Sequence, residues 1–338
     1  MDLTKSLLRV DLNNEFNGDS DIDEKLNFSH QYCLGKVFSR RVTKIEELEC
    51  NQKLLVSSYE SRIKIGWSKF DTIKGSHGHH YFVLNNKKDI ILACDIYSIG
   101  IYFMESKLHY HWYYTSKIKS VAFVENFFVA IAFENINYIR FHFWENFLLR
   151  KEKRIKCLVG HTSNINILSS VNNDHLISGS DDSTIKYWKI STLECIQTFV
   201  GHRGFITCLK LLSPKIFVSG SYDTTIKIWD LESRLCLKTF VGHQNYLVDI
   251  QETKNGQIVS LDCEGVLNFW NVKTGCRILS LSDKQNDMWS CFRILDSGEL
   301  VTGSVKGLIH IWSKEKNIRN NICSDKEAKS KTKTCSIL

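Results

Sequence analysis

The chain has 338 residues, of which 43% are hydrophobic, 24% are charged and only one is proline, and its formal net charge at pH 7 is +7. This composition is sufficient for a sizeable core and excludes a mostly disordered chain. The positive charge of the middle of the chain is spread too thinly for a nucleic-acid-binding stripe, so we expect no nucleic-acid partner.

The cysteines and the first residues of the chain indicate a cytoplasmic protein. The start, MDLTKSLLRVDLNN, lacks the apolar core of a signal peptide. The longest apolar stretch, residues 121–133, contains Glu125 and is too short to span a bilayer. The twelve cysteines include no CxxC pair, which disfavours a zinc ribbon. Four of them share one recurrent strand position, where we expect buried thiols in a reducing compartment: Cys33, Cys195, Cys236 and Cys276.

The N-terminal segment is acidic. Residues 1–30 carry seven acidic and three basic side chains and few apolar ones, so we expect a disordered tail. The next residues, 32–38 (YCLGKVF), match a strand pattern that recurs later in the chain.

Three segments in the first half show a strand, a turn and a second strand, although their sequences diverge. They span residues 54–65, 90–103 and 127–143. β-Branched and aromatic residues on both sides of a short turn predict β-hairpins in these places. The hairpins end near Gly66-Trp67, Phe103 and Phe143-Trp144.

Two histidine groups in this half have residue types that bind metals. The first comprises His77, His79 and His80, and the second comprises His109 and His111, which strand alternation places on one face. No nearby Cys, Asp or Glu completes a set of four ligands, so we expect no bound metal. The chain also lacks a Ser-His-Asp motif in context, a phosphate-cradling glycine loop and a paired-carboxylate signature. We therefore expect neither enzymatic activity nor a cofactor.

Four tryptophans follow at nearly equal spacing in the second half. Trp188, Trp229, Trp270 and Trp312 are separated by 41, 41 and 42 residues, and each closes a similar segment, such as LISGSDDSTIKYW and FVSGSYDTTIKIW. A fixed period of about 40 residues is the signature of a repeat architecture. One such hairpin cannot bury both of its faces, so several must stack or close into a ring.

These segments resemble the blades of WD-repeat proteins. The Gly-His pairs at 160–161, 201–202 and 242–243 precede them, and Trp229-Asp230 is a literal Trp-Asp ending. The resemblance implies an all-β propeller whose blades are locked by a hydrogen-bonded chain of His, Ser or Thr, Asp and Trp. In this chain the implied locks are His161, Ser178, Asp182 and Trp188; His202, Ser219, Asp223 and Trp229; and His243, Ser260, Glu264 and Trp270. The last segment keeps Thr302 and Trp312 but has Lys306 at the acid position, so we expect its lock to be lost.

The segment ends predict a seven-bladed WD-repeat β-propeller, because they fall near residues 66, 103, 144, 188, 229, 270 and 312. The strand at 32–38 matches the outer strand that follows each tryptophan, so we expect it to complete the last blade and close a monomeric ring. The expected organisation is an acidic tail over 1–30, the propeller over 31–316 and a basic, flexible tail over 317–338.

The resemblance also implies an interaction surface at the end of the ring where the chain enters the innermost strands. Its expected residues lie three and five positions after each Gly-His histidine, or just before each lock acid. They are Asn164, Asn166, Asp181, Phe205, Thr207, Tyr222, Tyr246 and, by aligning DKQNDMWSC with GHQNYLVDI, Trp289. Arg203, directly after His202, is added as the only arginine placed near this rim. Exposed aromatic side chains are preferred anchors of protein interfaces, so we expect one or more protein partners here.

The last residues, Cys335-Ser336-Ile337-Leu338, resemble a CaaX box. The resemblance implies prenylation of Cys335, and the final leucine favours a geranylgeranyl group. Lysines at 326, 329, 331 and 333 supply the second signal that stable attachment to an anionic membrane generally needs. Cys323 is a weaker candidate for reversible acylation.

Taken together, these features predict a non-catalytic scaffold or adaptor at the cytosolic face of a membrane. One alternative is the substrate receptor of a ubiquitin-ligase complex, because residues 157–243 have the cadence of F-box/WD-repeat propellers. No F-box precedes the ring, and Arg203 is the only arginine placed near its rim. A second alternative is a secreted bacterial effector that acts as such an adaptor in a host cell.

Overall fold

The computed structural model describes a ring of β-sheets. The described residues are 28–36, 41–48, 53–58, 62–66, 70–74, 81–84, 90–103, 109–125, 128–143, 156–282 and 288–314. Within these ranges all regular elements are strands, 28 in number, and they form seven four-stranded antiparallel sheets. No helix in this part of the chain is long and apolar enough to cross a membrane.

We name the sheets blades and number them along the chain. Blade 1 comprises β2 (Val42–Leu48), β3 (Lys53–Ser58), β4 (Arg62–Gly66) and β5 (Phe70–Lys74). Blade 2 comprises β6 (Tyr81–Leu84), β7 (Ile90–Cys94), β8 (Ser98–Phe103) and β9 (His109–Tyr113). Blade 3 comprises β10 (Ile118–Glu125), β11 (Phe128–Phe133), β12 (Tyr138–Phe143) and β13 (Lys156–Val159). Blade 4 comprises β14 (Ile165–Asn172), β15 (His175–Ser180), β16 (Thr184–Lys189) and β17 (Glu194–Val200). Blade 5 comprises β18 (Ile206–Leu211), β19 (Ile216–Ser221), β20 (Ile226–Asp230) and β21 (Cys236–Phe240). Blade 6 comprises β22 (Leu247–Glu252), β23 (Ile258–Asp262), β24 (Leu267–Trp270) and β25 (Arg277–Leu281). Blade 7 comprises β26 (Trp289–Ile294), β27 (Leu300–Ser304), β28 (Leu308–Lys314) and β1 (Phe28–Lys36).

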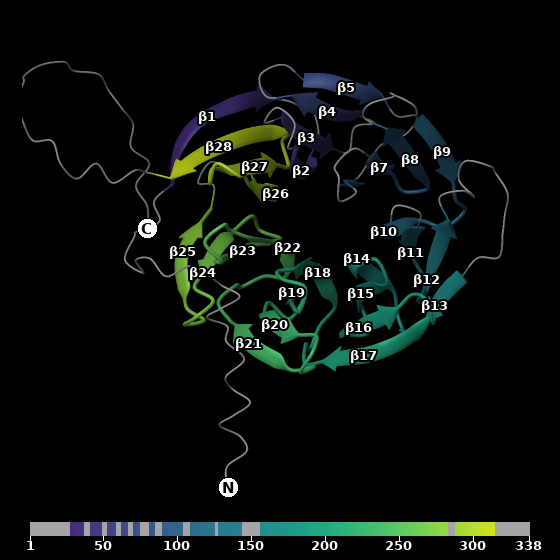
Figure 1. The fold of residues 1–338 in the computed structure, drawn as a ribbon. Helices are drawn as coiled ribbons and strands as arrows, with labels where there is room; N and C mark the ends of the chain where they lie inside the picture. Colours follow the sequence, from purple (N-terminus) through teal and green to yellow (C-terminus); the bar gives the residue numbers. More distant parts are fainter. Residues whose placement is uncertain are drawn as a thin grey trace, which may run out of the picture.

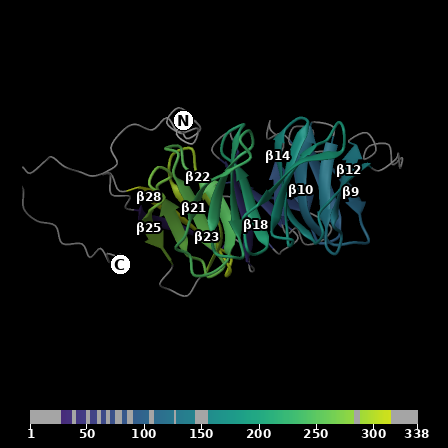
Figure 2. The same ribbon diagram turned by 90° about the horizontal axis from the view of Figure 1, so that it is seen from below.

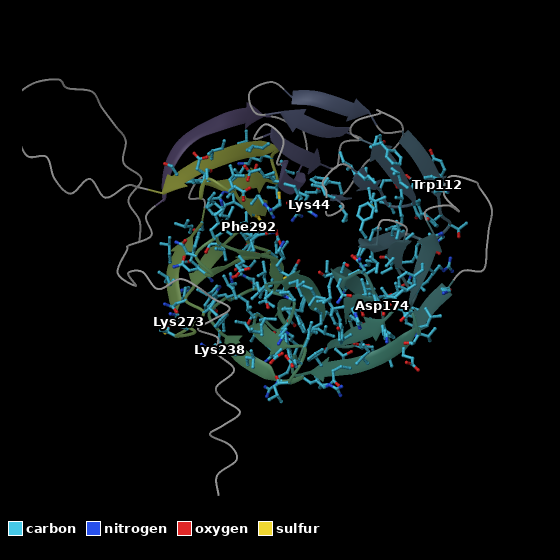
Figure 3. All side chains as sticks on the ribbon, in the orientation of Figure 1. Lys44, Trp112, Asp174, Lys238, Lys273 and Phe292 are labelled. Carbon is cyan, nitrogen blue, oxygen red and sulfur yellow. The ribbon has the colours of Figure 1, made fainter. Side chains whose placement is uncertain are left out.

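The blades are arranged around a central channel, with the first strand of each blade innermost (Figure 1). Successive innermost strands contact one another, as β14, β18, β22, β26 and β2 do in turn. Seen from the side, the strands run between the two faces of a thick disc (Figure 2). Side chains fill the space between blades, while Lys44 lies beside the channel and Lys238 and Lys273 lie at the outer edge (Figure 3).

The outer edge of blade 7 is formed by β1, which pairs antiparallel with β28. The sequence placed this strand at 32–38 and began the propeller at residue 31, and both bounds are corrected by the structure. The strand spans Phe28–Lys36, and its first residues pair with the far end of β28, Phe28 opposite Lys314 and His30 opposite Trp312. The reason is that β28 continues two residues beyond Trp312, so its free edge offers ladder partners further back along the chain.

The blades pack closely because their second strands are buried on both faces. In β19 all six residues are buried, and the strand IFVSGS accordingly combines three apolar residues with three small ones and shows no alternation with exposed residues. Gly220 lies where β19 meets the next blade, and a Cβ there would lie 2.6 Å from Cys208 Sγ and 2.8 Å from Leu247 Cβ. Gly179 and Gly303 hold the equivalent places, so the Ser-Gly-Ser repeat reflects close contact between sheets.

The outermost strands are half exposed, and this corrects the prediction of buried thiols. Cys195, Cys236 and Cys276 are exposed, and the side chain of Cys33 lies outside the described residues. The strand pairing shifts register between Tyr187 and Trp188 and again between Ile228 and Trp229. Cys195 is the residue opposite Trp188, and Cys236 is the residue opposite Trp229. These bulges turn the first residues of the outer strands toward solvent.

The predicted hydrogen-bonded locks of blades 4 and 5 are present. Trp188 Nε1 donates to Ser178 Oγ at 2.8 Å, Ser178 Oγ lies 2.8 Å from His161 Nε2, and His161 Nδ1 lies 2.7 Å from Asp182 Oδ2. This order of donors fits a neutral imidazole with its proton on Nδ1. The corresponding distances in blade 5 are 2.7, 2.7 and 2.9 Å for Trp229, Ser219, His202 and Asp223.

In blade 6 the predicted lock acid is wrong. His243 Nδ1 lies 3.0 Å from Asp262 Oδ2, whereas Glu264, the predicted partner, is exposed. Asp262 occupies the position that Ser180 and Ser221 hold in the preceding blades. Its other carboxylate oxygen accepts the backbone N–H groups of Glu264 and Val266, so one aspartate both holds the turn and reaches the histidine. In blade 7, Trp312 Nε1 still donates to Thr302 Oγ1 at 3.0 Å.

Breaking one lock should destabilise the whole ring. His202→Ala removes the acceptor for Ser219 and the donor to Asp223, and each buried group left unsatisfied costs about 1–3 kcal/mol. We expect the free energy of unfolding, measured in urea, to fall by about 2–4 kcal/mol. Glu232→Ala, at a side chain that is 71% exposed, serves as the control and should change stability by less than about 0.5 kcal/mol. Equal stability of His202→Ala and wild type would contradict the role of the lock.

The same lock should give stability a dependence on acid pH. Burial opposes ionisation of Asp223, but hydrogen bonds from Thr225 and the Arg203 amide outweigh it and lower the pKa of Asp223 to about 2. A lowered folded-state pKa stabilises the fold above the unfolded value of about 4, and this contribution is lost as the pH falls from about 4 toward about 2. Urea unfolding across this range should therefore show a shallower pH dependence for Asp223→Asn than for wild type.

Candidate protein-interaction face

Among the described residues, one end of the ring presents a repeated pair of side chains on blades 3 to 7. In these blades the residue before the innermost strand accepts, through its backbone carbonyl, the N–H of the first residue of the turn between the second and third strands. The pairs include Asn164 and Asp181 at 2.9 Å, Phe205 and Tyr222 at 2.8 Å, Tyr246 and Cys263 at 3.0 Å, and Met288 and Val305 at 3.0 Å. We call this end the entry face, because the chain enters each innermost strand there.

Blades 5 to 7 carry apolar side chains at these positions. Tyr222 is 53% exposed, Phe205 is 47% exposed and Met288 is 39% exposed, while Tyr246 is half-buried. The rings of Tyr222 and Tyr246 are stacked with centroids 4.4 Å apart, and those of Phe205 and Tyr222 are 5.7 Å apart. We call Phe205, Tyr222, Tyr246 and Met288 the aromatic arc. Contacts between the rings of Phe205, Tyr222 and Tyr246 hold these three side chains in one arrangement, so a partner would lose little side-chain entropy in binding them.

A basic side chain stands at one end of the aromatic arc. Arg41 precedes β2 as Phe205 precedes β18, since Val42 pairs with Ser58 as Ile206 pairs with Ser221. Arg41 is half-buried and makes no hydrogen bond or ion pair with another residue that the structure describes. Its positive charge acts on the Tyr246 hydroxyl, although burial dominates and raises the pKa of Tyr246.

The other end of the aromatic arc is polar and internally bonded. Asn166 Nδ2 donates to Asp181 Oδ1 at 2.6 Å, and Asn164 Nδ2 donates to Asp181 Oδ2 at 3.2 Å. Asn166 also reaches the Ile206 carbonyl at 3.1 Å, and so ties blade 4 to blade 5. These three predicted interface residues lie on the entry face, but they satisfy one another and have few groups left for a partner.

Two further predicted residues have structural contacts as well. The backbone N–H of Arg203 donates to Asp223 at 2.8 Å, and its side chain is exposed at the rim. Thr207 Oγ1 donates to the Gly220 carbonyl at 3.2 Å, at the mouth of the channel. Arg203 therefore remains a candidate contact for a partner, while the Thr207 hydroxyl is already used.

Trp289 was predicted on this face and is instead buried, with 3% exposure. Trp289 pairs with Ser304 as Ile206 pairs with Ser221, which makes it the first, inward residue of β26. Its ring packs against Trp312 with centroids 5.4 Å apart. The sequence alignment was one residue out of register, and a shift of one residue moves a strand side chain to the opposite face.

Met288 and Arg41, which hold the positions equivalent to Phe205, were missed for the same reason. Met288 precedes Trp289 in the chain, and Arg41 follows a segment with no Gly-His pair. A count backwards from the second strand would have found both, because the residue opposite the last position of that strand begins the innermost strand.

Several predicted sites lie outside the described residues. These are His77, His79, His80, Cys323 and Cys335, and the side chains of His109 and His111 on β9. In the part of the chain that the structure describes, no three His, Cys, Asp or Glu side chains group as metal ligands do. The His–Asp pairs of the locks are held by buried serine and tryptophan in successive blades, which is a structural arrangement.

Comparisons with known proteins agree with this geometry. Residues 152–189 and 193–230 match the family model described as "WD domain, G-beta repeat", so these two segments are WD40 repeats. A comparison with curated protein sequences finds no match. Among solved structures, the chain is similar to the WD40 β-propeller domain of Doa1, with a TM-score of 0.69 and 18% sequence identity over 86% of this chain and 98% of that one. The fold is therefore that of a WD40 β-propeller, a fold that typically serves as a scaffold for protein–protein interactions.

Proposed function

We propose that the protein is a non-catalytic adaptor that binds one or more protein partners through the aromatic arc. The observation that carries this proposal is the cluster of Phe205, Tyr222 and Tyr246, in which the two tyrosine rings are stacked and Phe205 and Tyr222 are exposed. Aromatic side chains and arginine dominate the binding energy of protein interfaces, and an exposed cluster of them is unfavourable in water unless something covers it.

The charges beside the arc support a partner that is acidic next to its apolar anchor. Arg41 and Arg203 are placed at the rim without an ion pair to any described residue. A carboxylate or phosphate on the partner would meet these guanidinium groups while an apolar side chain covers the tyrosine stack. The same chemistry would suit a substrate receptor of a ubiquitin-ligase complex, which remains the alternative function.

Removing the aromatic arc should abolish partner binding without unfolding the ring. The variant Phe205→Ala, Tyr222→Ala, Tyr246→Ala should lose a partner that wild type captures, because truncating hot-spot aromatics costs about 2 kcal/mol or more each. A matched control is the triple Val159→Ala, Val200→Ala, Val241→Ala, at exposed valines that end the outer strands of blades 3 and 4 and directly follow the outer strand of blade 5.

The measurement is affinity capture with all three proteins, followed by titration of the purified partner. A partner held equally by wild type and by the aromatic-arc variant would contradict the proposed face. Ubiquitin-ligase subunits among the proteins lost by the arc variant, but not by the valine variant, would favour the receptor alternative.

We also propose that the adaptor acts at the cytosolic face of a membrane through prenylation of Cys335. The support is the sequence CSIL together with the four lysines between 326 and 333. A prenyl chain and a basic segment together give stable attachment to an anionic leaflet, whereas either of them alone binds the membrane only reversibly. The proposal is independent of the propeller, since these residues lie outside the described part of the chain.

A CaaX box is processed only at the end of a chain, so mass spectrometry of the protein from eukaryotic cells is the direct measurement. Wild type should carry a geranylgeranyl group and sediment with membranes, and Cys335→Ser should do neither. Cys323→Ser is the matched control and should keep the prenyl group. An unmodified wild-type C-terminus with a diffuse cytosolic distribution would refute the anchor.

A further inference from the structure

The central channel contains a second feature that the aromatic arc does not explain. A cavity of about 580 Å³ lies along the axis, lined by residues from the innermost strands of all seven blades. Its size is within the range of roughly 300–1,000 Å³ that is typical of sites for small organic ligands.

The strand registers place one residue of each blade at the same level of the channel. These residues lie opposite equivalent positions of the second strands, such as Ser169 opposite Ile177 and Lys210 opposite Val218. The level comprises Glu46, Leu84, Ala122, Ser169, Lys210, Gln251 and Arg293. One side of the channel, blades 5, 6, 7 and 1, is therefore charged or polar, and the other side is small or apolar.

Most of the charged side chains satisfy one another. Arg293 Nη1 lies 3.0 Å from Glu46 Oε2 and donates to Gln251 Oε1 at 3.2 Å. Lys44 Nζ lies 3.6 Å from Glu46 Oε1 and donates to the Phe82 carbonyl at 3.0 Å. Glu46 is thus shared between two cations, and its carboxylate has little capacity left for a third.

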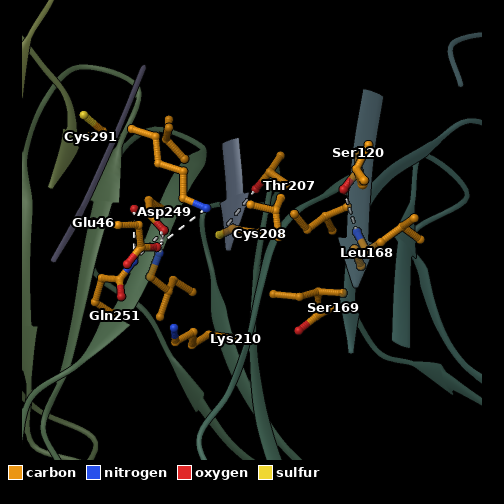
Figure 4. A pocket seen from close by; sticks show the side chains of 18 of the residues that line it. Glu46, Ser120, Leu168, Ser169, Thr207, Cys208, Lys210, Asp249, Gln251 and Cys291 are labelled. Carbon is orange, nitrogen blue, oxygen red and sulfur yellow. Dashed lines mark hydrogen bonds and ion pairs between the residues drawn. The ribbon is translucent and has the colours of Figure 1, made fainter. Parts of the chain in front are cut away.

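Two lysines of the lining are exceptions, Lys119, whose side chain is exposed, and the more buried Lys210. Lys210 lines the cavity, and it makes no hydrogen bond or ion pair with any residue that the structure describes. Figure 4 shows the dashed interactions around Glu46 and Asp249 and none that reaches Lys210. Burial lowers the pKa of Lys210, while Glu46 and Asp249 oppose that change from a distance. Its ammonium group therefore has three donors directed into a confined space without a bonded acceptor.

Asp249 does not serve as that acceptor. Its carboxylate accepts the Ile250 N–H at 2.8 Å and lies 3.4 Å from Gln251 Nε2. Burial raises the pKa of Asp249 to about 6, so its negative charge is only weakly favoured in the channel. With Lys44, Lys119, Lys210 and Arg293 against Glu46 and Asp249, the channel carries two net positive charges when both acids are ionised.

We propose that the channel is a binding site for a small organic anion, whose carboxylate or phosphate group bonds to Lys210 and whose compact apolar body lies against Leu84 and Ala122. The anionic group supplies the acceptor that the ammonium lacks. The net positive charge of the channel favours an anionic group, and the apolar side of the channel fits an alkyl or small-ring body.

The test uses the full chain and four probes that share a six-carbon body. They are hexanoate, hexyl phosphate, hexanol and hexylammonium, titrated by calorimetry at fixed ionic strength. We expect saturable binding of one or both anions and none of the alcohol or the cation. The affinities of hexanoate and hexyl phosphate then show whether the site prefers a carboxylate or a phosphate group.

Variants locate the binding. Lys210→Met should weaken anion binding at least about tenfold, the loss expected for one charge-assisted hydrogen bond. Asp249→Asn should strengthen it, because a competing negative charge is removed. Lys215→Met makes the same change in net charge at a side chain that pairs with Glu232 outside the cavity, and it should leave the affinity within about twofold.

Thermal unfolding of every variant shows whether a loss of binding comes from misfolding. Lys210→Gln is a second variant that removes the charge and keeps a polar side chain at this position. Three results would overturn the proposal: no saturable binding of either anion at about 10 mM, equal binding by Lys210→Met and wild type, or hexanol binding as tightly as hexanoate. None of these readouts depends on a protein partner, so they are separate from the test of the aromatic arc.

Discussion

The ring depends on a buried chain of hydrogen bonds that runs from tryptophan through serine and histidine to aspartate. Ser219 Oγ is fully buried and touches both Trp229 and His202, so the third strand, the second strand and the loop from the preceding blade meet at one oxygen. A buried hydroxyl, imidazole or carboxylate without a partner costs more free energy than one hydrogen bond gains. The hydrogen bonds of a lock therefore form nearly all together or not at all. The lock therefore fixes the position of each entry loop relative to its own sheet.

Fixing the entry loop has a consequence for the surface. In blades 3 to 7 the backbone carbonyl before the innermost strand is hydrogen-bonded to the turn beside it, as that of Phe205 is to Tyr222. Because this bond involves only backbone atoms, the side chains of the two residues are not needed to hold the loop in place. They can vary from blade to blade without disturbing the fold. The ring thus offers repeated, equivalent positions with different chemistry: a self-bonded polar network around Asp181 in blade 4, and stacked aromatics in blades 5 and 6.

The sequence predicted the locks of blades 4 and 5 residue by residue, because there the polar spacing and the β-branched strands agree. The prediction was wrong in blade 6, where the acid that bonds to the lock histidine stands at a different position of the repeat. Asp262 took over from Glu264 since a carboxylate at the serine position reaches the histidine directly, and spacing alone cannot reveal that. Trp289 was misplaced because the segment before it lacks a Gly-His pair to set the register. The polar side of the channel could not be predicted from the sequence. Lys210, Gln251 and Arg293 are far apart in the sequence and lie at the same level only because the blades close into a ring.

The aromatic arc and the charged side of the channel fall on the same blades. An arc residue stands just before the first residue of β18, β22 and β26, and Arg41 stands just before β2. Each of these four strands has a polar channel residue four positions after its first residue. At about 3.3 Å per residue the two levels are separated by roughly 16 Å, about twice the Debye length at physiological ionic strength. Direct electrostatic coupling between a partner on the entry face and an anion at Lys210 is therefore weak.

Mechanical coupling is also restricted. The second strands behind the innermost ones are fully buried, and at Gly220 the next blade is already in contact, so the strands have little room to slide. A ligand in the channel would have to act on the entry face through the side chains between the two levels, of which Lys44, Lys119 and Asp249 are charged. In the ring, the repeated backbone is rigid, and whatever communication exists between the two sites must pass through those side chains.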